Sequence, residues 1–217
     1  MDDDFKIFPP AGICRKETVV VVHGLFERGF WMYPVARHLA ASGYTAAVYS
    51  YPTTRARLAG HAERFSRAME KLLQKYPEHK ISFAGHSLGG LMIRSMLEKT
   101  EIPAVRRGRI FFMGVPHKGS PVARWVRKWL FFADRLVKVG PDLDNIPVPG
   151  QVELAPRPDW EFASAIARFD GLVPLRSSLL PGAAARRVFK TTHCFMIFNK
   201  NIHRALVNFL STGKMKN

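Results

Sequence analysis

The chain has 217 residues, of which 47% are hydrophobic and 23% charged, and its formal net charge is +16. This composition excludes a disordered chain, and the length leads us to expect that residues 1–217 form a single domain. The apolar runs are too short to span a bilayer and the start Met1-Asp2-Asp3-Asp4 is acidic, unlike a secretory signal, so we expect a cytoplasmic protein.

The basic charge would attract anionic partners at low ionic strength. Lys and Arg are spread along the chain, and no RNA- or DNA-binding motif accompanies them. We therefore do not expect nucleic acid as a partner, whereas an anionic membrane surface remains open. The only cysteines, Cys14 and Cys194, have a spacing that matches no zinc or redox motif, so neither a metal site nor a structural disulfide is expected.

Strand-like and helix-like segments alternate along the chain. Thr18–Val22 is β-branched and continuously apolar, which is typical of a strand buried on both faces. Hydrophobic spacing and helix-breaking residues predict further strands at 44–49, 81–84, 109–115, 162–169 and 187–191, and helices at 31–41, 55–76, 88–99 and 200–210. This alternation predicts an α/β fold with a mostly parallel sheet flanked by helices.

The segment 116–161 is the least regular part of the chain. Within it, residues 121–139 are basic and amphipathic, and Trp125 and Trp129 share one helical face. The favoured interpretation is a crossover helix that packs on the sheet, and the alternative is a lid or a helix that lies on a membrane surface. The segment is too short for a large cap domain.

The sequence Gly85-His86-Ser87-Leu88-Gly89 lies between a predicted strand and a predicted helix. In this context G-x-S-x-G is typical of a nucleophile elbow, in which the chain reverses over one strained residue with an exposed hydroxyl. Ser87 is therefore the predicted nucleophile. A serine hydroxyl needs a base, and that base needs a carboxylate to hold it in the correct tautomer.

Three histidines follow the elbow. His193 comes directly after the predicted strand 187–191, at the carboxyl edge of the sheet where Ser87 also lies, so it is the predicted general base. His203 lies inside the last predicted helix, and we interpret it as a surface or groove residue. His117 precedes every candidate acid, contrary to the order Ser, acid, His, and we interpret it as a residue that shapes its loop.

The acid is expected between Ser87 and His193. Asp170 is the preferred candidate because it directly follows the apolar stretch 162–169, on the loop after a predicted buried strand, and is followed by Gly171-Leu172-Val173-Pro174. Turn formation is the more common role for acidic residues in a long loop, although two of them could substitute if that loop folds inward. The other candidates are Asp134, Asp142, Asp144, Glu153, Asp159 and Glu161, of which Asp142 and Asp144 are the possible substitutes.

Two backbone amides are the expected donors to the oxyanion of the reaction. The amide of Leu88 follows the nucleophile at a helix start, where amides lack intrahelical acceptors. The second is the amide of Leu25, in the loop that follows the strand 18–22, because Gly24 lets the backbone turn there.

These motifs together resemble the small lipase and esterase branch of the α/β-hydrolase superfamily. The resemblance runs from about Thr18 to Leu210 and implies a minimal α/β-hydrolase fold, a carboxylic-ester hydrolase and no metal or organic cofactor. It rests on Val22-His23-Gly24-Leu25, Gly85-His86-Ser87-Leu88-Gly89-Gly90, Gly114-Val115-Pro116-His117-Lys118-Gly119-Ser120, Asp170-Gly171-Leu172-Val173-Pro174 and His193.

The predicted activity is therefore hydrolysis of a small-molecule or lipid ester through an acyl-enzyme on Ser87, with His193 as general base and Asp170 as its orienter. A thioesterase, an amidase or an acyltransferase would use the same three residues. The alternative from another class is a non-catalytic scaffold that binds anionic lipid or nucleic acid, although a binding protein has no need of all three residues.

Overall fold

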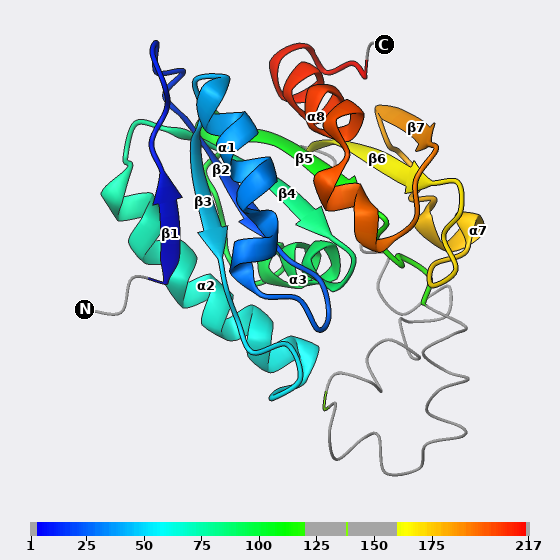
Figure 1. Cartoon of the computed structure of the whole chain (residues 1–217). Helices are drawn as coiled ribbons and strands as arrows, with labels where there is room; N and C mark the ends of the chain where they lie inside the picture. Colours follow the sequence, from blue (N-terminus) through cyan, green and yellow to red (C-terminus); the bar gives the residue numbers. More distant parts are fainter. Residues whose placement is uncertain (1–3, 120–137, 139–159, 216–217) are drawn as a thin grey trace.

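A seven-stranded sheet forms the centre of the structure, a computed structural model that describes residues 4–119, 138 and 160–215 (Figure 1). The strand order is β1-β3-β2-β4-β5-β6-β7, and every neighbouring pair is parallel except β1 with β3. The strands are β1 (Phe5–Phe8), β2 (Glu17–Val22), β3 (Thr45–Tyr49), β4 (Lys80–His86), β5 (Arg107–Met113), β6 (Glu161–Ala167) and β7 (Ala185–Phe189).

Helices cover both faces of this sheet, which creates two apolar layers. Alternation along β2 shows the division: Val20 and Val22 pack on the side of α2 and α3, and Val19 and Val21 on the side of α1 and α8. None of the helices in the described ranges is long and apolar enough to cross a membrane. The helical segments are η1 (Gly29–Met32), α1 (Tyr33–Ala41), α2 (Leu58–Lys75), α3 (Leu88–Leu97), η2 (Ala104–Arg106), α7 (Leu175–Ser178), η3 (Cys194–Phe198) and α8 (Lys200–Thr212).

The predicted α/β architecture is confirmed, with differences at several boundaries. Helix α2 begins at Leu58, three residues later than predicted, and β5, β6 and β7 each end two residues earlier. Strand β1 and the short helix α7 were not predicted at all. The amphipathic segment 121–139 lies outside the described residues except for Lys138, and so does most of the segment 116–161.

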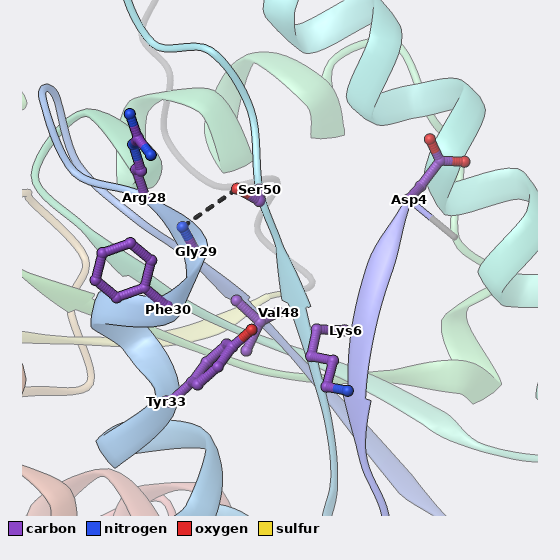
Figure 2. Close-up of a pocket in the computed structure, with 8 residues that line it drawn as sticks. All are labelled: Asp4, Lys6, Arg28, Gly29, Phe30, Tyr33, Val48 and Ser50. Carbon is purple, nitrogen blue, oxygen red and sulfur yellow. Dashed lines mark hydrogen bonds between the residues drawn. The ribbon is translucent and has the colours of Figure 1, made fainter. Parts of the chain in front are cut away.

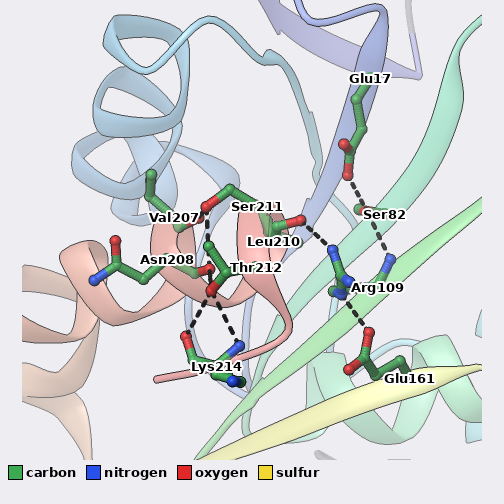
Figure 3. Close-up of polar contacts among 10 residues, drawn as sticks. All are labelled: Glu17, Ser82, Arg109, Glu161, Val207, Asn208, Leu210, Ser211, Thr212 and Lys214. Atoms are coloured by element: carbon green, nitrogen blue, oxygen red, sulfur yellow. Dashed lines mark hydrogen bonds and ion pairs between the residues drawn. The ribbon is translucent and has the colours of Figure 1, made fainter. Parts of the chain in front are cut away.

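A polar cluster around Arg109 joins several elements at the amino edge of the sheet (Figure 3). The guanidinium of Arg109 pairs with Glu161 on β6 and donates to the carbonyl of Leu210 on α8 at 2.7 Å. Its backbone amide donates to Ser82 Oγ at 2.8 Å, and Ser82 in turn donates to Glu17 on β2. Glu161, one of the candidate acids, therefore lies at the edge opposite to the strand ends that carry the predicted catalytic residues.

Glycines let α3 approach the sheet closely. A Cβ at Gly89 would lie 2.4 Å from the carbonyl oxygen of Val22, and one at Gly90 would lie 2.2 Å from Val115 Cγ2. Such separations are well below van der Waals contact. The start of α3 can therefore rest against β2 only because side chains are missing at these positions.

We expect Gly89→Ala to destabilise the protein by about 2–3 kcal/mol, because the added methyl meets backbone that cannot move aside. The matched control is Gly60→Ala in α2, where the new Cβ meets only Ala56 Cβ at 3.7 Å. That control should be neutral or slightly stabilising, since alanine is the better helix former. Urea denaturation of both variants measures the difference, and equal stabilities would contradict the steric argument.

Candidate active site

Ser87 occupies the sharp turn between β4 and α3. Its φ of 49° and ψ of −121° are strained for a residue with a Cβ, as expected for a nucleophile elbow. The turn is held from both sides: the Ser87 amide donates to the carbonyl of Met113 at 2.9 Å, and the Gly90 amide donates to the carbonyl of Ser87 at 3.0 Å. The predicted elbow geometry is therefore present in the structure.

His193 and Asp170 form a hydrogen-bonded pair in the loops that follow β7 and β6. The distance from His193 Nδ1 to Asp170 Oδ2 is 2.8 Å, and both side chains are more than 90% buried. The other oxygen of Asp170 accepts hydrogen bonds from the amides of Leu172 and Val173 at 2.9 and 2.8 Å. Asp170 is thus fixed in place by its own turn while it binds the imidazole.

The surroundings of Asp170 keep it ionised. Burial acts to raise the pKa of this carboxyl, but the hydrogen bond and charge of His193 and the two backbone amides outweigh it, so the pKa lies below its ordinary value. A carboxylate at Asp170 requires the proton of neutral His193 to sit on Nδ1. The lone pair of the ring is then on Nε2, which leaves that nitrogen able to accept a proton.

The imidazole of His193 lies beside the elbow. Its ring centroid is 4.9 Å from that of His86, the residue before Ser87. A Cβ at Gly114 would lie 3.1 Å from His193 Nδ1, so the ring packs directly on the backbone that follows Met113, the residue whose carbonyl holds Ser87. The structure thus places the Asp170–His193 pair beside the elbow that carries Ser87, at the carboxyl edge of the sheet.

The loop after β2 packs against the nucleophile. A Cβ at Gly24 would lie 3.0 Å from Ser87 Cβ, so even a methyl group there would be tightly confined. His23 orders this loop, since its Nε2 accepts from the Tyr51 amide at 3.3 Å and its Nδ1 then donates to the carbonyl of Gly24 at 3.0 Å. The Tyr51 hydroxyl also donates to the carbonyl of His23 at 3.1 Å. Leu25, the predicted donor, follows in this ordered turn.

A second carboxylate–histidine pair was missed by sequence reasoning. Glu27 Oε1 lies 2.8 Å from His86 Nδ1, and Glu27 Oε2 accepts from the Gly24 amide at 2.7 Å. Burial acts to raise the pKa of Glu27, but His86 and the Gly24 amide outweigh it and lower the pKa. The signal available in the sequence was the position of Glu27, an acidic residue in a strongly basic chain, two residues after the predicted oxyanion donor Leu25.

His117 and His203 are both buried and serve other contacts. Arg94 Nη1 lies 2.8 Å from His117 Nδ1, and burial together with Arg94 places the pKa of His117 well below its ordinary value. His203 donates from Nε2 to the carbonyl of Ile197 at 2.9 Å. The predicted surface or groove placement of His203 was wrong, because this side of α8 faces the core. The remaining acid candidates, Asp134, Asp142, Asp144, Glu153 and Asp159, lie outside the described residues.

Two surface cavities lie beside the loop after β2. One, of about 500 Å³, includes Phe26, Glu27 and Tyr51 in its lining and so adjoins the site. The other, of about 560 Å³, lies between β1, β3 and η1 and is lined by Phe30, Tyr33 and Lys6 and by Gly29 and Ser50, which share a hydrogen bond (Figure 2). The cavities share Arg28 and Ser50. Of these two cavities, the first is the one lined by Glu27, which contacts His86 in the elbow.

The described residues contain no group of three or more His, Cys, Asp or Glu side chains able to hold a metal ion. Cys14 and Cys194 are both exposed free thiols. Among the described residues at the site, the groups suited to chemistry are thus a hydroxyl, two imidazoles and two carboxylates.

Comparison with known proteins agrees with this geometry. The family described as "Putative serine esterase (DUF676)" matches residues 15–117, a range that includes the loop after β2 and the elbow. A comparison with curated proteins gave no match.

Solved structures with the same fold include lipases. The mature form of Bacillus licheniformis lipase BlEst2 is 17% identical, with a TM-score of 0.71 over 90% of this chain and 93% of that one. A monoacylglycerol lipase from Paleococcus ferrophilus is 16% identical, with a TM-score of 0.64 over 95% and 98%. A "putative thioesterase" from Silicibacter sp. tm1040 is 17% identical, with a TM-score of 0.70 over 96% and 80%.

The chain is therefore an α/β-hydrolase by fold, as its motifs predict. Its resemblance to the lipases and esterases of that superfamily is confirmed.

We expect the contribution of Asp170 to stability to depend on pH. Because its folded pKa lies below the unfolded value of about 3.9, the ionised carboxylate stabilises the fold at neutral pH, and this stabilisation is lost as the pH falls through the folded pKa. Asp170→Asn should therefore be less stable than wild type at pH 7, and the gap should narrow below pH of about 4. Urea denaturation of both proteins across this pH range measures the difference in their free energies of unfolding. A difference that does not change with pH would contradict the pairing of Asp170 with His193.

Proposed function

We propose that the protein hydrolyses carboxylic esters, with Ser87 as nucleophile, His193 as general base and Asp170 as the residue that orients it. The observation that carries the proposal is the bond between His193 Nδ1 and Asp170, 2.8 Å long, beside a serine in a strained elbow. It leaves Nε2 of His193 able to accept a proton, beside the elbow that carries the Ser87 hydroxyl, and acyl transfer requires a base in such a place.

The reaction would proceed in two halves. His193 Nε2 takes the proton of Ser87 as its Oγ bonds to the ester carbonyl carbon, and the negative oxygen of this tetrahedral intermediate is bound by the amides of Leu25 and Leu88. The intermediate collapses, the bond to the alcohol breaks, and His193 returns the proton to the departing alkoxide. Water then attacks the acyl-enzyme by the same proton transfers, releasing the acid and free Ser87.

The surroundings of the site favour an apolar substrate. Large apolar side chains are exposed on the loops at the carboxyl edge, and we call this set the apolar rim: Phe26, Phe30, Trp31, Phe169, Leu172, Leu175, Phe195 and Phe198. Together with the likeness to lipases, it favours an ester with an apolar acyl chain. The likeness to the "putative thioesterase" makes thioesters the second candidate substrate class, and the same triad would also serve an amidase or an acyltransferase.

The apolar rim also supports an anionic membrane surface as a partner. Ring contacts join part of it into one aromatic patch: Trp31 lies 6.0 Å from Phe198, and Phe195 lies 6.4 Å from Phe198 between ring centroids. Exposed aromatic residues on a chain of net charge +16 suit an interface with anionic lipid. A cytoplasmic location, where exposed thiols such as Cys194 stay reduced, is part of the same proposal.

The test of the proposed activity is hydrolysis of p-nitrophenyl esters of graded chain length together with labelling by a fluorophosphonate. We expect wild type to hydrolyse and to be labelled, Ser87→Ala to lose both, and Asp170→Asn to fall by about 10³–10⁴-fold in kcat. The control is Ser211→Ala, which removes an exposed hydroxyl on α8. An unlabelled and inactive wild-type protein would favour the scaffold that only binds lipid or nucleic acid.

Membrane association is tested with vesicles of phosphatidylglycerol and phosphatidylcholine in a co-sedimentation assay. Replacing both Phe195 and Phe198 with Ser should weaken binding about a hundredfold or more, since each buried phenyl ring contributes roughly 1.5–3 kcal/mol and about 1.4 kcal/mol corresponds to a tenfold change. The control is Val105→Ser, because Val105 is exposed but lies before β5, at the amino edge. Equal binding by all three proteins would contradict a role for the apolar rim.

A further inference from the structure

Glu27 contacts two of the parts from which the site is built. One of its oxygens accepts from the Gly24 amide at 2.7 Å, in the loop that carries the Leu25 amide, and the other lies 2.8 Å from His86 Nδ1, in the elbow. The Glu27 side chain is only 13% exposed, and that of His86 only 1%. A carboxylate in such a place is costly to bury unless its partners are fixed.

His86 extends this contact to the third part of the site. Its Nε2 lies 3.2 Å from the carbonyl oxygen of His193, and the two imidazole rings pack with centroids 4.9 Å apart. Both ring nitrogens of His86 therefore face oxygen atoms, one a carboxylate and the other a carbonyl. A carbonyl can only accept, so the contact with His193 requires a proton on Nε2, whereas Nδ1 lies close to the Glu27 carboxylate without an aligned hydrogen bond.

We infer that Glu27 and His86 form a buried carboxylate–imidazole pair that positions the reacting groups of the site. The inference rests on the proposed hydrolase function. The Glu27 carboxylate contacts the loop that carries the Leu25 amide and contacts His86, the residue before the nucleophile. His86 in turn contacts the backbone of His193, the proposed general base. Neither side chain is assigned contact with the substrate, so both are positioning residues.

Positioning explains why polar side chains, rather than apolar ones, occupy this buried place. Two apolar side chains of similar size would fill the space at a lower desolvation cost, but they would fix neither the Gly24 amide nor the His193 carbonyl. The pair sets the separation between three loops that the chain itself joins only through long connections. Errors of about 1 Å in such separations can cost about 10²-fold in rate.

The decisive variant is Glu27→Gln, which keeps the size of the side chain and removes its charge. A glutamine offers one oxygen and one NH₂ group, so it cannot accept from both Gly24 and His86. We expect kcat for the best p-nitrophenyl ester to fall by about 10²-fold with KM little changed, because substrate contacts are intact while the transition-state geometry is not. Labelling by the fluorophosphonate should slow in parallel.

A double-mutant cycle separates positioning from general damage. His86→Gln should lower kcat by a similar factor, and Glu27→Gln with His86→Gln should be little worse than either alone, because each change already breaks the same unit. The matched control is Glu63→Gln, an exposed carboxylate on α2 that pairs only loosely with Arg67 at 3.8 Å. It should leave kcat and the thermal midpoint unchanged.

Glu27→Asp provides a second measurement should Glu27→Gln fail to fold. The shorter carboxylate keeps the charge but cannot reach both partners. The kcat of Glu27→Asp should therefore lie between the kcat values of wild type and Glu27→Gln. If only Glu27→Asp folds, its kcat should lie below that of wild type. If wild type is active and the folded Glu27 variants keep its kcat, the inference is wrong and the proposed function stands. If wild type neither hydrolyses esters nor is labelled, both fall together.

Discussion

The close approach of α3 to the sheet is the constraint on which the site depends. Ser87 can hold its strained φ of 49° because β4 and α3 are packed on either side of it, with Gly89 almost touching the backbone of Val22. Strain of this kind costs about 1–3 kcal/mol and persists only where the surrounding packing fixes it. The same contact brings the end of β2, and with it the Leu25 turn, next to the nucleophile.

Two carboxylate–histidine pairs lie side by side in this strongly basic chain. Asp170 and Glu27 both have their pKa lowered by an imidazole and by backbone amides, against the effect of burial. Their histidine rings are 4.9 Å apart, yet they have different partners. The His193 pair leaves one ring nitrogen available for proton transfer, whereas both nitrogens of His86 lie close to oxygen atoms of the protein, and this difference underlies the proposed division between chemistry and positioning.

The sequence predicts the fold well where the signals are local. A β-branched run such as Thr18–Val22 specifies a doubly covered strand, and the strand–Gly-x-Ser-x-Gly–helix context specifies the elbow. Strand β1 was not predicted because a strand of four residues is too short to show a clear hydrophobic periodicity. It forms by antiparallel pairing with β3, which is distant in sequence. Glu27 was not predicted as a site residue because its role depends on contacts with Gly24 and with His86, which is 59 positions away in the sequence. His203 was misplaced because a lone histidine does not reveal which side of its helix is buried.

The two edges of the sheet divide stability from function. At the amino edge, Arg109 joins β4, β5, β6 and α8 through polar contacts, and these lie away from the site. At the carboxyl edge, side chains of the apolar rim such as Phe195 remain largely exposed, which lowers solubility. An arrangement of this kind lets the carboxyl loops change without loosening the core. The exposure of the apolar rim therefore fits the proposed contact with an apolar substrate or a membrane surface better than a role in stability.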